Sequence, residues 1–132
     1  MSELYKKILL ATDGSEQNKK AVTHAIEQAK ISGAELHAVY VLDMKTDYEP
    51  KSYLSTDLSN VENIAKKEGI NVKKWIVKGH PAEEILKLAK EKAADLIVIG
   101  SLGRSGIEKI LLGSVADKVI RNSSIPVLIV RK

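Results

Sequence analysis

The stretch Ala94-Asp95-Leu96-Ile97-Val98-Ile99-Gly100-Ser101-Leu102-Gly103-Arg104-Ser105-Gly106 joins an apolar run to a group of closely spaced glycines. The run over residues 94–99 is typical of a strand buried on both faces, as in a parallel sheet covered by helices. The glycines therefore begin at the carboxyl end of a strand, where open α/β sheets bind their ligands. Because glycine leaves backbone N–H groups uncovered beside a helix start, the stretch predicts a phosphate-binding loop and a nucleotide ligand.

The spacing of the glycines is unlike two common phosphate-binding motifs. Two residues separate Gly100 from Gly103, and nine more precede Gly113-Ser114. This is neither the Walker pattern G-x-x-x-x-G-K-[ST] nor the dinucleotide fingerprint G-x-G-x-x-G. The residues alone leave an alternative open, in which Gly100 and Gly103 form a tight turn and Gly113 ends a helical turn.

The rest of the chain alternates between strand and helix patterns. Strands are expected over residues 5–12, 35–42, 71–78, 94–99 and 127–130. Ser15 can cap a first helix that Gly33 closes, and a second helix, with apolar residues at helical spacing from Leu54, ends at Gly69. Pro81 suits the first position of a third helix, and a fourth is expected over residues 114–121. The polar stretch over residues 43–52 is expected to be a loop.

This alternation predicts an α/β fold of one domain, residues 1–132, with right-handed crossovers. The expected architecture is an open, doubly wound, parallel five-stranded sheet with helices on both faces, which is Rossmann-like. Periodicity alone leaves the strand orders 3-2-1-4-5 and 2-1-3-4-5 open. The lysines of the third strand, Lys73, Lys74 and Lys78, suit a sheet edge, where charge deters pairing with other chains.

Composition excludes several classes of protein. The 132 residues are 44% hydrophobic, enough for one core, and no cysteine is present, which excludes disulfides, thiolate metal sites and a cysteine nucleophile. The start of the chain lacks the order of a signal peptide, and no apolar run approaches the roughly 20 residues of a membrane span. A cytoplasmic protein without a membrane partner is expected.

The net charge of +4 does not by itself indicate nucleic-acid binding. The lysines are scattered in pairs, aromatic residues make up only 4% of the chain, and there is no Phe. Stacking platforms for bases are therefore scarce, and no nucleic-acid motif is present. We expect no specific nucleic-acid partner.

Four stretches together resemble the universal stress protein family, in particular its ATP-binding branch. They are residues 7–15 (KILLATDGS), residues 79–85 (GHPAEEI), the glycine signature Gly100, Gly103, Gly113 and Ser114, and residues 123–130 (SSIPVLIV). The resemblance covers essentially the whole chain. It implies the strand order 3-2-1-4-5, ATP as ligand with Mg²⁺ or Mn²⁺, and a role in stress response or signalling.

The resemblance also implies which residues contact the nucleotide. Thr12 ends the first strand and Asp13 follows it, Asp13 being the expected metal partner, and the backbone of Val41 is expected at the adenine. The phosphate loop would comprise Gly100, Ser101, Gly103, Arg104, Ser105 and Gly106, followed by Gly113, Ser114 and Val115. Three of these residues have a plainer alternative: Asp13 can form a turn that helps to cap the first helix, Val41 can be core, and Ser114 can be a helix N-cap.

No catalytic residue is assigned. His24, His37 and His80 belong to three different elements without metal-ligand spacing, so they are expected to be packing, surface or turn residues. The Walker lysine and an evident general base are missing, which favours a nucleotide-binding module over an efficient enzyme. A slow ATPase or autophosphorylating enzyme in the same pocket remains the alternative, as does AMP or another adenine compound as ligand.

The final strand indicates a homodimer. Residues Val127 to Val130 carry no charge, yet the strand order 3-2-1-4-5 puts them at a sheet edge. An uncharged apolar edge invites pairing with another chain, and a two-fold dimer is the commonest closed solution.

Overall fold

The structure is a computed structural model that describes residues 4–12, 18–43, 52–101 and 112–131. The strands are β1 (Lys7–Ala11), β2 (Glu35–Asp43), β3 (Val72–Gly79), β4 (Leu96–Gly100) and β5 (Val127–Val130). The helices are α1 (Lys19–Ser32), α2 (Ser52–Lys67), α3 (Pro81–Glu91) and α4 (Ser114–Asn122). Within these ranges no helix combines the length and the apolar character that a membrane span requires.

The strands form a single parallel sheet in the order β3-β2-β1-β4-β5. This is the order that the family resemblance implied, and the alternative order 2-1-3-4-5 is wrong. The edge predicted for the lysine-bearing strand is confirmed, because β3 pairs only with β2 among the described strands and exposes Lys73, Lys74 and Lys78. The uncharged strand β5 forms the opposite edge.

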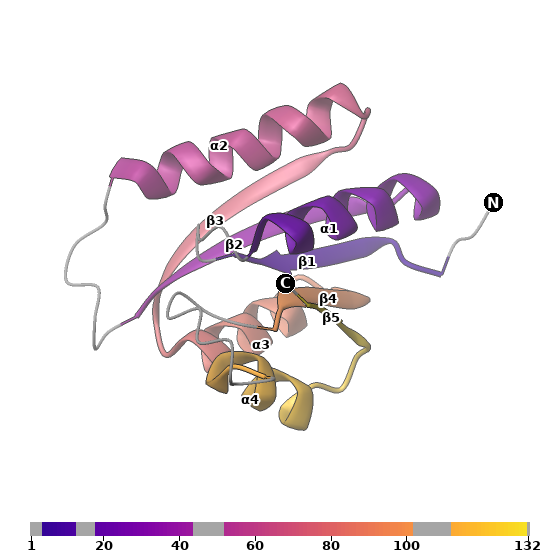
Figure 1. The fold of residues 1–132 in the computed structure, drawn as a ribbon. Coiled ribbons are helices and arrows are strands. Elements are labelled where there is room, and N and C mark those ends of the chain that lie inside the picture. The colour runs from indigo at the N-terminus through magenta and orange to yellow at the C-terminus, as the bar shows by residue number, and fades with distance from the viewer. Residues whose placement is uncertain (1–3, 13–17, 44–51, 102–111, 132) are drawn as a thin grey trace.

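Two apolar cores cover the two faces of the sheet, with α1 and α2 on one side and α3 and α4 on the other (Figure 1). Successive strand residues point to opposite faces, so the central strand β1 serves both cores. Ile8 and Leu10 belong to the core on the side of α1 and α2, whereas Leu9 and Ala11 belong to the core on the side of α3 and α4. The doubly wound architecture predicted from the sequence is confirmed.

The C-terminal ends of α1 and α2 and the start of α3 follow the local rules that predicted them. Gly33 closes α1 in the left-handed conformation, with φ of 68°, and Pro81 is the first residue of α3. The second helix ends at Lys67, and Gly69 follows it with φ of 74°. The expected cap of the first helix, Ser15, lies outside the described residues; α1 itself begins at Lys19.

Candidate functional site

The reversal of strand order lies at β1, which pairs with β2 on one side and β4 on the other. The helix that follows β1 packs on one face of the sheet, and α4, which follows β4 in the chain, packs on the opposite face. A crevice opens at such a switch point, outside the carboxyl ends of the strands. The topology therefore puts the ends of β1 and β4 at the ligand-binding position of an open α/β sheet.

Thr12 extends β1 by one residue toward this crevice. Its backbone N–H donates to the Val39 carbonyl over 3.0 Å, and the residue is buried. Val41, two residues beyond Val39, is half-buried, and its side chain packs on the core shared with α3 and α4. The Val41 side chain is therefore part of the core, which is the plainer of the two expectations for this residue. The other expectation, a contact with adenine, concerns the backbone of Val41 and is compatible with this packing.

The two ends of the glycine-rich stretch meet at the carboxyl end of β4. Gly100 is the last residue of the strand, and the Ser101 N–H donates to the Val130 carbonyl of β5 over 2.9 Å. The Ser101 carbonyl in turn accepts a bond from the Gly113 N–H at 2.5 Å. This bond holds the start of α4 against the end of β4.

The N-terminus of α4 supplies hydrogen-bond donors at this position. Gly113 occupies the N-cap, with φ of −66° and ψ of 160°, and Ser114 is the first helical residue. The expectation that Ser114 is the N-cap is therefore wrong by one residue. The first helical bond runs from the Asp117 N–H to the Gly113 carbonyl, so the N–H groups of Ser114, Val115 and the next residue have no intrahelical partner.

The one carboxylate in the first turn of α4 is paired. Asp117 accepts two bonds from Nε of Arg121, both of 3.0 Å, one turn further along the helix. A free carboxylate among these donors would repel an anion. Its pairing leaves the exposed Ser114 hydroxyl and the backbone donors as the polar groups at the helix start.

Five predicted site residues lie outside the described residues: Asp13, Gly103, Arg104, Ser105 and Gly106. The expected metal partner, Asp13, is among them. In the part of the chain that the structure does describe, no group of three or more His, Asp or Glu side chains could hold a metal ion. The described residues that the structure brings together at the carboxyl ends of β1 and β4 are Thr12, Gly100, Ser101, Gly113 and Ser114.

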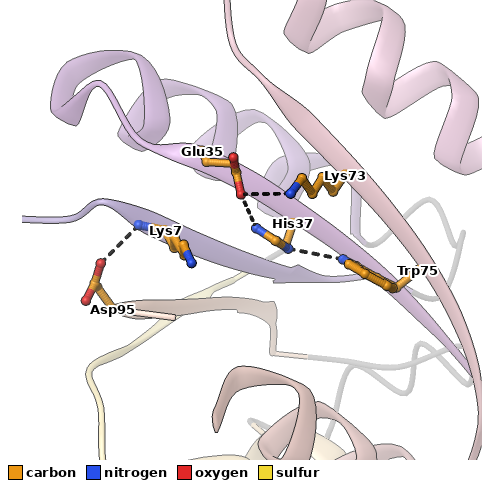
Figure 2. A network of polar contacts seen from close by, with 6 residues as sticks. All are labelled: Lys7, Glu35, His37, Lys73, Trp75 and Asp95. Atoms are coloured by element: carbon orange, nitrogen blue, oxygen red, sulfur yellow. Dashed lines mark hydrogen bonds and ion pairs between the residues drawn. The ribbon is translucent and has the colours of Figure 1, made fainter. Parts of the chain in front are cut away.

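A second polar cluster, near the amino end of β2, escaped the sequence analysis (Figure 2). His37 is 3% exposed, its Nε2 lies 2.6 Å from Oε1 of Glu35, and Nε1 of Trp75 donates to its Nδ1 over 3.1 Å. The hydrogen bond with His37 is the main reason that the pKa of Glu35 is lowered from its ordinary value. No local motif announces this cluster, because it depends on the register of β2 against β3, in which Val39 pairs with Trp75.

The fold defines an open parallel α/β sheet protein in which the N-terminus of a helix lies beside the switch point of the sheet. A model of the universal stress protein family matches residues 4–131, and the chain belongs to this family. One relative, universal stress protein MJ0531 of Methanocaldococcus jannaschii, is 42% identical over an alignment that covers 98% of this chain and 84% of the relative.

Solved structures of similar proteins agree in fold. The structure of MJ0577, from the same organism, superposes with a TM-score of 0.85 at 34% identity, covering 98% of this chain and 97% of that one. A universal stress protein in complex with cAMP gives 0.79 at 32% identity, covering 97% and 98%. The Archaeoglobus fulgidus protein in complex with dAMP gives 0.73 at 26% identity, covering 96% and 98%. Adenine nucleotides are thus bound by two proteins of this fold.

Proposed function

We propose that this protein binds ATP with Mg²⁺ or Mn²⁺ at the carboxyl ends of β1 and β4, and that it acts in the cytoplasm as a nucleotide-dependent module of the stress response. The observation that carries the proposal is the bond from the Gly113 N–H to the Ser101 carbonyl. It brings the N–H groups at the start of α4, which lack an intrahelical partner, to the end of the strand that opens the glycine stretch. Such donors at a helix N-terminus favour a phosphate group.

The adenine part of the ligand is supported by the relatives. The complexes with cAMP and dAMP belong to proteins that share this fold over nearly their whole length. We place the adenosine of ATP near Thr12 and the backbone of Val41, at the ends of β1 and β2. The phosphates would then extend over Gly100 and Ser101 toward Ser114, with Gly103, Arg104, Ser105 and Gly106 completing the loop.

A divalent cation fits this arrangement if the nucleotide supplies most of its ligands. Mg²⁺ is commonly held by one or two carboxylates together with substrate phosphates. Asp13, directly after Thr12, is the carboxylate that we assign to this role. When bound, the cation would neutralise part of the phosphate charge, while the chain's own residues orient the nucleotide through backbone donors.

The test is to identify and measure the bound nucleotide. We expect mass analysis of the extracted protein to detect an adenine nucleotide, and titration calorimetry of the stripped protein to show tighter binding of ATP with Mg²⁺ than of AMP or cAMP. Binding of AMP alone would contradict the assignment of ATP. Phosphate release well above background would favour the slow ATPase over the binding module.

A separate variant tests the assignment of Asp13 as the metal partner. Asp13→Ala is expected to weaken ATP binding more in the presence of Mg²⁺ than in its absence, because only the metal complex uses the carboxylate. Glu91→Ala, which removes an exposed carboxylate at the end of α3, is the control for the loss of one negative charge. An equal loss with and without the metal would show that Asp13 is not a metal partner.

We also propose that the protein forms a homodimer through β5. The carbonyl of Pro126 accepts a bond from Ile97 of β4, and that of Val130 accepts one from Ser101, directly after β4. By strand alternation the backbone groups of residues 127 and 129 therefore face outward. This edge carries no charged side chain, in contrast to the lysines on β3. Two-fold pairing of β5 with its copy would satisfy the outward groups.

A further inference from the structure

The ring of His37 contacts two partners, the Glu35 carboxylate, which accepts a hydrogen bond, and the Trp75 indole, which donates one (Figure 2). Its Nε2 lies 2.6 Å from Oε1 of Glu35 on the same strand, and its Nδ1 accepts the Nε1–H of Trp75 on β3 over 3.1 Å. The imidazole and indole planes differ by only 4°, with 6.1 Å between ring centroids. The side chain of His37 is 4% exposed, so water does not replace either partner.

The partners determine where the proton of the ring resides. An indole N–H can only donate, so the Nδ1 that faces it must carry a lone pair. The remaining proton is then on Nε2 and is donated to the Glu35 carboxylate. The observed contact with Trp75 therefore requires the neutral imidazole in one tautomer.

We propose that protonation of His37 breaks the bond between His37 and Trp75 and thereby makes the β2–β3 contact a pH-sensitive switch. An imidazolium carries an N–H on both nitrogens, so its Nδ1–H would face the Nε1–H of the indole at close range. The bond from Nε2 to Glu35 survives as a charge-assisted hydrogen bond, which is stronger than its neutral counterpart. Glu35 thus holds the ring in both states, and the indole has to turn away.

The charged groups nearest the ring come from β2, β3 and β1, and Lys92 at the end of α3 lies over the neighbouring indole. Glu35 is the carboxylate in contact; Lys73 of β3 lies 3.9 Å from its Oε1, and Lys7 of β1 also acts on it electrostatically. On β1's other side, Asp95 accepts the backbone N–H groups of Lys6 and Lys7 and so is engaged elsewhere.

The indole connects the switch to helix α3. Lys92, at the C-terminal end of α3, places its Nζ 4.2 Å from the centroid of the Trp75 ring. Trp75 is only half-buried on the edge strand, so the indole can turn toward solvent at the cost of part of its packing on the core under α3 and α4. Its release would remove this cation–π contact and, with it, a link between the edge strand and α3.

The sole tryptophan of the chain makes the test direct, because the indole N–H gives a single NMR signal. The native protein is titrated from about pH 8 to about pH 5, where histidine side chains change charge. We expect the Trp75 indole signal and the ring nitrogens of His37 to shift together in one step. The backbone amide spectrum should remain that of a folded protein.

Three histidine variants isolate the responsible side chain. His37→Gln should abolish the step in the indole signal, whereas His24→Gln and His80→Gln, both at exposed positions, should preserve it. If His37→Gln does not fold, the wild type alone tests the proposal. The indole signal of Trp75 and the ring-nitrogen signals of His37 must then shift with the same midpoint pH. A step that survives His37→Gln, a charged His37 with an unmoved indole signal, or a His37 that stays neutral until the protein unfolds would each overturn the proposal.

Discussion

The Nε1–H of Trp75 donates to Nδ1 of His37 over 3.1 Å, a side-chain bond that joins the edge strand β3 to its neighbour β2. Edge strands have backbone partners on one side only, so a buried side-chain bond adds to what holds β3 in the sheet. Because the acceptor is 3% exposed, losing the donor leaves a polar atom without a substitute.

We therefore expect Trp75→Phe to lower the free energy of unfolding by about 1–3 kcal/mol, the cost of an unsatisfied buried group. Urea unfolding followed by far-ultraviolet circular dichroism measures this without the lost fluorophore. Ile76→Thr is the control: the neighbouring residue is 45% exposed, and we expect a change within about 0.5 kcal/mol. A Trp75→Phe protein as stable as the wild type would mean that the bond contributes nothing.

The lowered pKa of Glu35 predicts that the folded protein loses stability in acid. Its pKa is lowered in the folded protein, first by the hydrogen bond with His37, so the ionised form stabilises the fold above the pKa of the unfolded chain. That contribution disappears as the pH falls through the folded-state pKa. The stability difference between wild type and Glu35→Gln should thus shrink below about pH 4.5, the ordinary glutamate value.

The measurement is urea unfolding at a series of pH values, with Glu91→Gln as a control for removing an exposed carboxylate. We expect the control to differ from the wild type by much less than Glu35→Gln at neutral pH. A Glu35→Gln difference that stays constant through the acid range would contradict the role of the ionised carboxylate.

Gly113→Val tests the proposed phosphate site. The backbone at Gly113, with φ of −66°, suits any residue, so the variant is expected to fold and to lose only about 1 kcal/mol from the poorer N-cap. Its side chain would stand where phosphate approaches the start of α4, and we expect ATP affinity to fall at least about tenfold, or 1.4 kcal/mol. Calorimetric titration measures the affinity.

Ser124→Val, in the exposed connection between α4 and β5, is the matched control and should bind ATP as the wild type does. Gly103→Val, at another glycine of the signature, is expected to behave like Gly113→Val. Unchanged affinity in both folded glycine variants would refute the assignment of the phosphate loop.

Ile129→Pro tests the proposed dimer. The backbone N–H of residue 129 faces outward, so proline should remove a donor from the β5–β5 pairing and give a folded monomer. Leu128→Pro removes an inward donor to β4 and should instead destabilise the sheet. Light scattering gives the mass, and circular dichroism the fold.

Ile129→Ala separates the backbone effect from the loss of the side chain, since it retains the N–H and should remain dimeric. A wild type that is monomeric at micromolar concentration would end the hypothesis. A dimer that persists in Ile129→Pro would place the interface elsewhere.

The sequence by itself determined the elements and the faces they bury. Apolar spacing in α1 and α3, the left-handed Gly33 and the first-turn Pro81 act within a few residues, so their effects could be predicted locally. The same holds for the glycines at the end of β4, because a doubly buried strand followed by glycine already indicates a ligand-binding turn.

Only the tertiary structure decided how these elements meet. Periodicity left two strand orders open, because the alternation of strand and helix patterns along the chain is the same in both. The family resemblance implied the order 3-2-1-4-5, and the sheet has that order. The bond that closes Gly113 onto Ser101 and the contact between His37 and Trp75 depend on that order and on strand register. Register reflects the summed burial of many distant residues, so a histidine that local patterns assign to ordinary packing proved to lie at the centre of a polar network.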